Sequence, residues 1–534
     1  MIVRLGVFPG VLFVAGLAAP QVVELAATPQ KFVTFYSPGA SEVPAELTSS
    51  PPAPLPAGGV QAVAVATDGA VWLGTAKGLI RYHPGEPAPS RRQYFAGRRY
   101  LPGDNVRNLH PGPSADMWVL TAAGVAHIEL RPMTLAVKAE YFERRIRARH
   151  DRYGLVAGST FTEPGNPATN RLTPSDNDGL WTAVYAAAEC FRFAVTRSSE
   201  ALANARKSIE ALLFLEQVTG RPGFPARSYI RRGDWRPADG IWHWTSDGRH
   251  EWKADTSSDE IVGHFFLFAV AAEHLPDAAL KARIAAAAGR IMDHILDHGY
   301  HLTDVNGKPT TWGRWSPSYF ATPTGKPDSP LNALELLSFL KTAHRLTGRA
   351  RYLTEYRKAA VEMKYAELTA RLLELREELN YSDEQLALLS FYPLFQYESD
   401  PVLLGLYRRA LDQWWENIQR EQNPLGTFLY LTARPEARVD LAGAVHTLYR
   451  IPMDLIHWTV TNSHRGDVEW DPAPDRFGRR QARTLLPPDE RPVMKWNGNP
   501  FRVEGGSGGG GEDDGSFFLL PYWLGRYHGF LAGE

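Results

Sequence analysis

Most of this 534-residue chain is a long succession of amphipathic segments. From about residue 141 onward, apolar residues recur at helical spacing; Trp181, Val184 and Ala188, for example, share one face. An apolar stripe of this period predicts a helix that buries one side. Such segments lie near residues 178–197, 200–219, 259–275, 277–298, 330–347, 350–378, 382–396, 400–421, 438–450 and 516–530.

The connections between these segments alternate between short and long. Short breaks, such as residues 197–199 and 276–277, predict antiparallel helical hairpins, whereas long loops rich in Trp, Arg and Gly separate successive pairs. The poorly patterned residues 451–515 leave room for one or two further helices. We therefore expect a mainly α fold, an (α/α)6 helical-hairpin toroid, with residues 140–534 as the catalytic domain.

In its number of hairpins and the character of its loops, the region 140–534 resembles the six-hairpin glycosidase and polysaccharide-lyase superfamily. The resemblance implies a site at one end of the barrel, lined by the long loops and the ends of the inner helices. It also implies a carbohydrate substrate.

A repeat precedes the helical segments. Residues 59–82 align with residues 105–128 at an offset of 46, which pairs Trp72 with Trp118 and Gly78 with Gly124. Short apolar alternations broken by turns predict small antiparallel strands, and a period in the forties is typical of propeller blades. The phrase VWLGTAKGLIRY resembles the blades of two-component-regulator-type propellers. Two copies are too few to close a ring, so we expect a small β region over 59–135 whose edges the next domain covers.

The first twenty residues have the pattern of a cleavable export signal: Arg4, an apolar stretch over 5–17, and small residues at 18–19. A proline-rich segment follows within 21–58, and no later stretch is apolar enough for stable membrane insertion after the signal is removed. The sequence therefore predicts a secreted or periplasmic protein. Its oligomeric state is left open.

The charge balance and the missing motifs exclude several functions. The chain has 58 basic and 59 acidic residues, so a nucleic-acid partner has no electrostatic support. The sequence contains no HExxH, CxxC, P-loop or GxSxG motif. We therefore expect neither a metal nor a cofactor.

Two similar stretches, SDNDGLW at 175–181 and EDDGSF at 512–517, suggest candidate carboxylates. They align Asp178 with Asp514 and Trp181 with Phe517. Helix capping explains one acid of each stretch, but in a closed ring the first and last helices are neighbours, so these acids can approach one another. Asp255 precedes another apolar helix and is also available. Glycoside hydrolysis needs two carboxyl groups, for which the candidates are Asp178 and Asp255, with Asp514 in reserve and the acid and base roles unassigned.

Polar and aromatic residues in the loops and on the inner helices are candidates for substrate binding. Trp faces stack on sugar rings and Arg binds carboxylates, whereas the simpler alternative is packing on the barrel rim. His264 is expected to point at the central cavity. The candidates are Trp181, Arg227, Trp252, His264, Trp312, Arg314, Trp315, Tyr319, Asn462, Arg465 and Trp496.

The leading hypothesis is therefore a secreted carbohydrate-active enzyme that hydrolyses glycosidic bonds. An alternative is a polysaccharide lyase in which His464 or Tyr229 removes a proton while Arg465 or Arg227 binds the uronate carboxylate. A non-catalytic glycan-binding or sensor module, suggested by the propeller-like repeats, is a third hypothesis.

Overall fold

The computed structural model of the chain describes residues 21–49, 59–375 and 380–533. The predicted export signal and most of the proline-rich segment lie outside these ranges. Every helix within them is too short or too polar to cross a bilayer.

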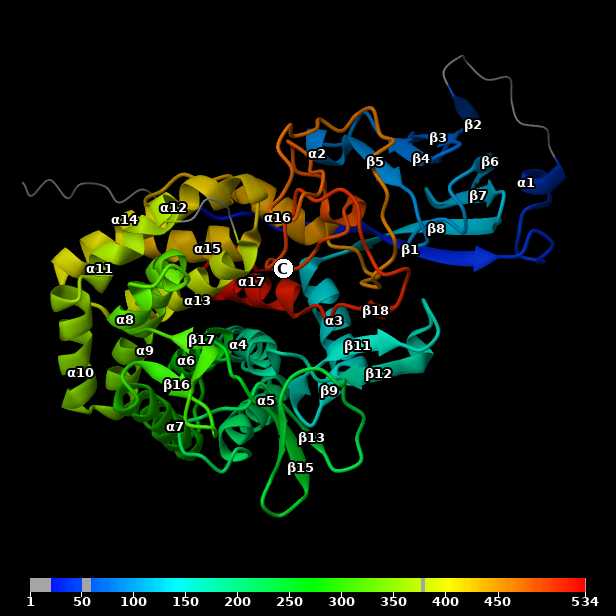
Figure 1. Cartoon of the computed structure of the whole chain (residues 1–534). Coiled ribbons are helices and arrows are strands. Elements are labelled where there is room, and N and C mark those ends of the chain that lie inside the picture. The colour runs from blue at the N-terminus through cyan, green and yellow to red at the C-terminus, as the bar shows by residue number, and fades with distance from the viewer. Residues whose placement is uncertain (1–20, 50–58, 376–379, 534) are drawn as a thin grey trace, which may run out of the picture.

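The two sequence repeats form two four-stranded antiparallel sheets (Figure 1). In the first sheet, Val60 pairs with Thr75 before the register shifts; in the second, Val106 pairs with Thr121 before the same shift. The two aligned segments therefore share one irregularity of strand pairing. The strands of the first sheet, in order, are β2 (Val60–Val65), β3 (Val71–Thr75), β4 (Gly78–Tyr82) and β5 (Arg92–Phe95), and those of the second are β1 (Thr28–Tyr36), β8 (Gly124–Met133), β7 (Met117–Thr121) and β6 (Val106–Pro111).

The β region begins earlier in the chain than the sequence predicts. Strand β1 precedes both repeats and pairs along β8, from Thr28 opposite Met133 to Tyr36 opposite Val125. The two sheets share one apolar core, which includes the buried Trp72 and Met117. Two short helices, α1 (Ala45–Ser49) and α2 (Ala88–Arg91), lie between strands of this region.

The rest of the chain is mainly helical. Its main helices are α3 (Leu135–Arg149), α4 (Asp178–Thr196), α5 (Ser199–Gln217), α6 (Ser258–His274), α7 (Ala278–Asp297), α9 (Gly325–Thr347), α10 (Ala350–Arg357), α13 (Tyr381–Tyr397), α14 (Pro401–Ile418), α15 (Pro424–Ala433), α16 (Leu441–Arg450) and α17 (Ser516–Tyr527). Shorter ones are α8 (Pro317–Phe320), α11 (Tyr365–Leu368) and α12 (Leu372–Leu375).

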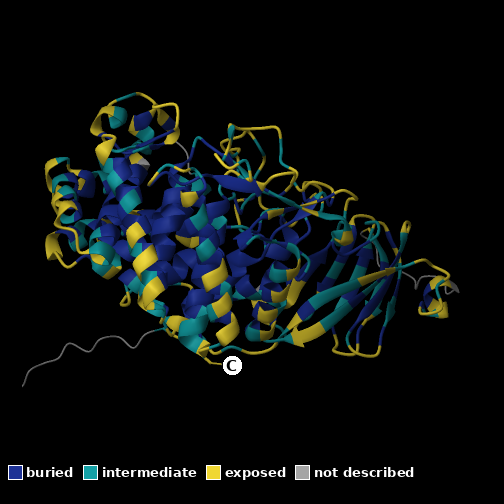
Figure 2. Cartoon of the chain, turned by 90° about the horizontal axis from the view of Figure 1, so that it is seen from below, coloured by how far each residue is buried: buried dark blue, intermediate teal, exposed yellow. Residues whose placement is uncertain are grey.

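The helices pack in a closed series of contacts. Helix α4 packs against α6, α6 against α9, α9 against α13, α13 against α15, α15 against α17, and α17 again against α4. The predicted contact between the first and last of the sequence-derived helices is thereby confirmed. Figure 2 shows buried helical segments at the centre of this region and exposed faces on the helices at its periphery.

Two predictions for individual helices are wrong, and two other helices are not predicted from the sequence. The two additional helices are α3 and α15, whereas residues 451–515 contain only a short 3-10 turn (Pro488–Glu490) and β18 (Gly511–Glu512). The long helix predicted over 350–378 ends as an α-helix at Arg357 and continues as a π-helical turn, before Lys364 adopts a left-handed conformation. Helix α15 is apolar on nearly all sides and therefore lacks the amphipathic period by which helices are recognised.

Long loops lead to the amino ends of α4, α6, α9 and α17, and short ones to their antiparallel partners. We call the end of the helical region where these amino ends lie the loop end. Its strands are β9 (Asp151–Arg152), β10 (Leu155–Val156), β11 (Gly158–Phe161), β12 (Asn170–Thr173), β13 (Ser228–Arg231), β14 (Trp242–Trp244), β15 (His250–Lys253), β16 (His301–Thr303) and β17 (Pro309–Arg314).

Residues 451–515 connect the β region to the helices. The backbone N–H of Tyr94, on the outer strand β5, donates to Glu490 Oε1 at 3.0 Å. Farther along, β18 pairs with β11 beside α3 and α4. The expectation that a later part of the chain covers an edge of the β region is therefore confirmed for β5.

Candidate functional site

The structure divides the predicted site residues among three places. One group lies at the amino ends of α4 and α6, a second surrounds Lys495 at the amino end of α17, and a third joins residues 451–515 to β5. The first group includes Asp176, whose side chain is 55% exposed and which Arg227 links to Asp255.

Asp178, the first predicted catalytic residue, is fully buried. Its carboxylate forms an ion pair with Arg152 and accepts hydrogen bonds from Ser228 Oγ and from Ser175 Oγ, the latter at 2.8 Å. A substrate cannot reach a carboxylate without accessible surface. Asp178 instead anchors the start of α4 to β9 and β13.

Asp176, two residues earlier, has the exposure that Asp178 lacks. Its side chain is 55% exposed, and Lys253 Nζ lies 2.6 Å from Oδ1. Arg227 approaches the other oxygen, with Nη1 3.7 Å from Oδ2. Two cations thus lie beside a carboxylate that solvent and substrate can reach.

Asp259, in the first turn of α6, is held toward its protonated form. Burial is the main cause and raises the pKa of this carboxyl, whereas hydrogen bonds, including one with Ser257, and the charge of Arg227 lower it; the charge of Asp176 makes the smallest contribution and raises it. Asp176 and Asp259 are thus electrostatically coupled carboxyls in different environments. Such an arrangement separates an acid from a base within one site.

Asp255 precedes α6 in the chain and has a left-handed backbone conformation, with φ at 55°. Its Oδ1 accepts a hydrogen bond from the Thr311 N–H at 2.7 Å, and its own N–H donates to Asp304 Oδ2 at 3.0 Å. A left-handed conformation is uncommon for a residue other than glycine and occurs often at functional sites. We call Asp176, Asp255 and Asp259 the carboxylate cluster.

Arg227 has a different role from the predicted one. Its Nε donates to the Asp255 carbonyl at 2.5 Å and its Nη1 to the Asp176 carbonyl at 3.4 Å. These bonds tie together the two loops that carry the carboxylate cluster. Arg227 therefore positions the cluster, and its side chain is mostly buried.

Glu260 is a buried acid that does not stand out in the sequence. Its Oε1 accepts from the Gly179 N–H at 3.1 Å, Oε2 has no hydrogen-bond partner among the described residues, and burial raises its pKa well above the usual value. A Cβ atom at Gly179 would lie 1.9 Å from Oε2. In the sequence, Glu260 looks like an ordinary acid in the first turn of a helix, where a negative charge is favourable.

His264 does not point into a central cavity, so that expectation is wrong. The buried ring lies beside Gly179 of α4 and the ring of Phe268, and Nδ1 is 2.6 Å from the Glu260 carbonyl oxygen. Burial lowers its pKa to about 4. His264 is therefore a neutral residue of the core.

The predicted residues of the β17 loop differ in accessibility. The ring of Trp312 is 54% exposed, whereas Trp315 is fully buried and donates from Nε1 to Glu335 Oε2 at 2.9 Å. Arg314 stacks on Tyr319, whose hydroxyl donates to Asp328. Trp312 alone among these offers a widely exposed ring.

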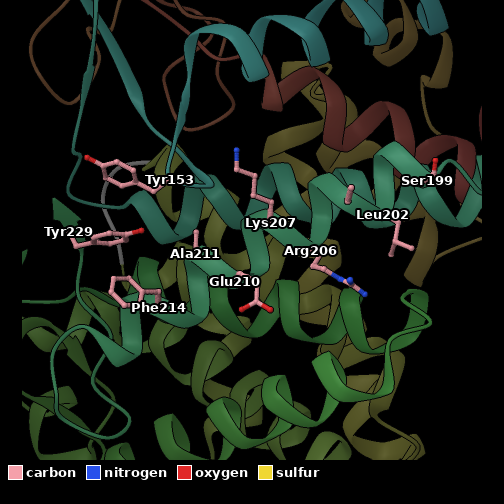
Figure 3. A pocket seen from close by; sticks show the side chains of 10 residues that line it. Tyr153, Ser199, Leu202, Arg206, Lys207, Glu210, Ala211, Phe214 and Tyr229 are labelled. Carbon is pink, nitrogen blue, oxygen red and sulfur yellow. The ribbon is translucent and has the colours of Figure 1, made fainter. Parts of the chain in front are cut away.

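Tyr229 and Trp252 lie on the other face of the β13–β15–β14 sheet from Lys253. They pair across the strands with each other, and both are buried. Tyr229 lines a hollow of about 570 Å³ against α5, where Phe214 and Lys207 also contribute (Figure 3). Burial raises the pKa of Tyr229 to about 12. The proposed lyase base is thus separated by the sheet from Asp176.

The second group lies around Lys495 at the amino end of α17. Lys495 Nζ lies 3.2 Å from Asp513, 3.5 Å from Asp514 and 4.8 Å from the centre of the Trp181 ring. Burial raises the pKa of Asp514, but the charges of Lys495 and His150 and the hydrogen bonds from Ser516 together outweigh burial and keep the pKa below its usual value. The predicted reserve carboxylate is a buried ion-pair partner.

The two similar stretches meet here through their aromatic residues, whereas their acids bind different cations, Arg152 for Asp178 and Lys495 for Asp514. Trp181 and Phe517 line the same small cavity, of about 10 Å³, together with Lys495 and Trp496. Trp496 donates from Nε1 to the Phe517 carbonyl at 2.7 Å. Both predicted tryptophans therefore belong to packing around a nearly filled space.

The third group fastens residues 451–515 to the β region. His464 Nε2 lies 2.8 Å from the Tyr94 hydroxyl, and Arg465 covers the Tyr94 ring and binds Glu490 at 2.9 Å. The Asn462 amide donates to the Glu490 carbonyl at 2.7 Å. Each of these three predicted lyase residues has a structural partner, and neither Tyr229 nor Tyr319 is among those partners.

Within the described part of the chain, no group of three or more His, Cys, Asp or Glu side chains is arranged to hold a metal ion. The carboxyls of the carboxylate cluster can transfer protons, and the neighbouring cations Lys253 and Arg227 can stabilise charge.

Comparison with known proteins gives distant structural likenesses only. No family model and no curated protein matches the sequence. A sugar epimerase from a ruminal bacterium is 10% identical, with 73% of this chain and 99% of that one covered and a TM-score of 0.40. A family 76 glycoside hydrolase (mannosidase) from Bacteroides thetaiotaomicron VPI-5482 is 9% identical, covering 74% and 99%, at 0.39. A thermostable endoglucanase from Alicyclobacillus acidocaldarius is 13% identical, covering 87% and 98%, at 0.39. Likenesses at this level assign neither fold nor activity.

Proposed function

We propose that this chain is a carbohydrate-active enzyme that hydrolyses glycosidic bonds, built on an (α/α)6 toroid formed by the closed series of helices. Asp259 is the general acid and Asp176 the ionised carboxylate. The observation that carries the proposal is the contrast in environment between these two carboxyls, which both lie near Arg227. One is beside Lys253 and Arg227, whereas the other is held toward its protonated form.

The reaction needs these two states at once. Asp259 gives its proton to the glycosidic oxygen as the bond from that oxygen to the anomeric carbon breaks. Asp176 stabilises the positive charge that develops on the sugar. A water molecule then adds to the anomeric carbon and loses its proton to a carboxylate. Asp255 holds the β17 loop against the same site through Thr311.

The two other hypotheses have less support. A lyase requires a base and a cation at one place, but Tyr229 is behind the sheet and His464 and Arg465 are engaged with β5 and Glu490. A binding module does not require an acid held toward protonation. Export to the periplasm or the medium is part of the proposal and rests on residues 1–20 of the sequence.

The test is substitution of each carboxylate in turn. Asp259→Asn and Asp176→Asn should each lower kcat by about 10² to 10⁴, the range of general acid–base catalysis. Asp255→Asn tests the third member, and Asp297→Asn, on an exposed site of α7, is the matched control with unchanged activity. Reducing ends released from a panel of neutral and uronic-acid polysaccharides provide the measurement.

Near-full activity of both Asp259→Asn and Asp176→Asn would overturn the proposed roles. Absorbance from an unsaturated product would instead indicate a lyase. Saturable binding with no cleavage of any polymer would favour a binding module.

A further inference from the structure

We propose that the carboxylate cluster lies in the middle of an extended glycan-binding surface, so that the enzyme cleaves inside a chain and not at its end. The surface consists of Trp312 on β17 and of Trp242 and Trp244 on β14, which we call the tryptophan track. Glycan binding by the track stands on its own, whereas internal cleavage rests on the proposed hydrolase function.

Trp242 and Trp244 belong to one face of an edge strand. Alternate residues of a strand point to the same side, about 7 Å apart along it. Their partners on β15 are Lys253 and Glu251, and β14 is the outer strand of its sheet. Trp244 is 53% exposed. The exposed Trp244 offers a stacking position for a sugar, whereas Trp242, on the same side of the strand, is contacted by Arg236 and Lys253.

Ion pairs connect this side of β14 to the carboxylate cluster. Lys253 Nζ lies 5.8 Å from the centre of the Trp242 ring and 2.6 Å from Asp176 Oδ1. The same nitrogen is 2.9 Å from Asp239, whose carbonyl accepts from Trp242 Nε1. Trp242 and the proposed catalytic carboxylate of Asp176 are therefore linked through Lys253.

The third ring lies beyond another member of the cluster. The Thr311 N–H binds Asp255, and the exposed Trp312 is the next residue along β17. Arg227 joins the backbones of Asp255 and Asp176. These contacts link the segment of Trp312, through Asp255, Arg227 and Asp176, to Lys253 beside Trp242.

The charges beside β14 favour uncharged sugars there. Lys253 is neutralised by Asp176 and Asp239, and Arg236 stacks on Trp242 while binding Glu251 at 2.9 Å. A uronate would need a cation free to bind its carboxylate. Stacking of a neutral ring on Trp244 needs none, so binding should change little with ionic strength.

Single exposed aromatic residues are common on protein surfaces and need no explanation. Trp235, 47% exposed and covered by Arg171 at 4.9 Å, is one of these and lies outside the contacts just described. It provides a matched control for substitution of Trp244 and Trp312, which are similarly exposed.

Binding is measured in the Asp259→Asn protein, so that turnover does not consume the polymer. Affinity electrophoresis uses hydroxyethylcellulose, mixed-linkage β-glucan, galactomannan and polygalacturonate as probes. Trp244→Ala and Trp312→Ala should each weaken binding to a neutral polymer by roughly 2- to 10-fold, the range for loss of one aromatic contact. Trp235→Ala should bind as tightly as its parent. Equal binding by all three variants, or binding to none of these polymers, overturns the track.

Cleavage is measured separately with otherwise unaltered protein. Internal cleavage lowers the viscosity of a polymer solution before many reducing ends accumulate, and Trp244→Ala should lose a larger factor of activity on polymer than on a short oligosaccharide. Release of single end units only would overturn internal cleavage. Tryptophan-dependent binding without any hydrolysis would refute the hydrolase proposal and leave the track intact, whereas hydrolysis with tryptophan-independent binding would do the reverse.

Discussion

The amino ends of α4 and α17 have similar sequences and different environments. At α4, Asp176 is open to solvent beside Lys253; at α17, Asp513 and Asp514 are buried around Lys495. The difference arises because residues 451–515 bring Lys495 and Trp496 over the start of α17. Chemically similar acids thus become a candidate reaction site in one place and an internal ion pair in the other.

The largest expected effect separates catalysis from stability. Asp259→Asn should lower kcat about 10²- to 10⁴-fold with little change in the free energy of unfolding, whereas Asp514→Asn should lower stability and leave the activity of folded protein nearly unchanged. Kinetics and urea unfolding of both variants provide the measurement. A comparable loss of kcat in Asp514→Asn would remove the functional distinction between the two ends.

The second prediction concerns the two lysines. Lys495→Met leaves two buried carboxylates without their cation and should lower the free energy of unfolding by about 3–5 kcal/mol. Lys253→Met removes the partner of the exposed Asp176 and should cost much less, about 0–1 kcal/mol. Urea unfolding compares the two proteins, and adding Asp513→Asn and Asp514→Asn to Lys495→Met should recover part of the loss.

The aligned glycines sharpen the comparison further. Gly179 has no room for a Cβ because of Glu260 Oε2, whereas Gly515 has φ at +95°, which other residues rarely adopt. Either glycine replaced by alanine should cost about 1–3 kcal/mol. Glu260→Ala should relieve the Gly179→Ala defect and not the Gly515→Ala defect. Equal rescue of both, measured by thermal unfolding, would contradict the two separate causes.

The smallest expected effect is on pH dependence, and it has opposite signs at the two ends. Glu260 has a raised pKa in the folded protein, so its stabilising contribution is full below its unfolded pKa and is lost as pH rises through the folded value. Asp514 has a lowered pKa, so its contribution is present above its unfolded pKa and is lost as pH falls through the folded value.

Glu260→Gln should therefore flatten the alkaline side of the stability curve, and Asp514→Asn the acid side. A tenfold difference in proton affinity between the folded and unfolded states corresponds to about 1.4 kcal/mol. Denaturant unfolding from acid to alkaline pH provides the measurement. If both variants flatten the same side, the assigned environments are wrong.

Much of the fold could be predicted from local sequence patterns. The spacing of residues indicates the repeat with its offset of 46 and the amphipathic hairpins, and it predicts that the first and last helices are neighbours. Helix α3 was not, because it buries Lys138 and Arg145, which interrupt its apolar stripe. Lys138 donates from Nζ to the carbonyls of Leu448 and Tyr449, at the end of α16. Such long-range partners have no signature in a local window.

The candidate site was predictable in kind and not in detail. The sequence by itself determined that acids precede the apolar helices, because capping and helix dipoles favour them at amino ends. Which acids remain accessible was decided only by the tertiary structure: Arg152 and Ser228 bury Asp178, while Asp176 is left open two residues away. Ionisation and access depend on the partners that folding brings from distant segments, and those partners set the chemistry of each carboxylate.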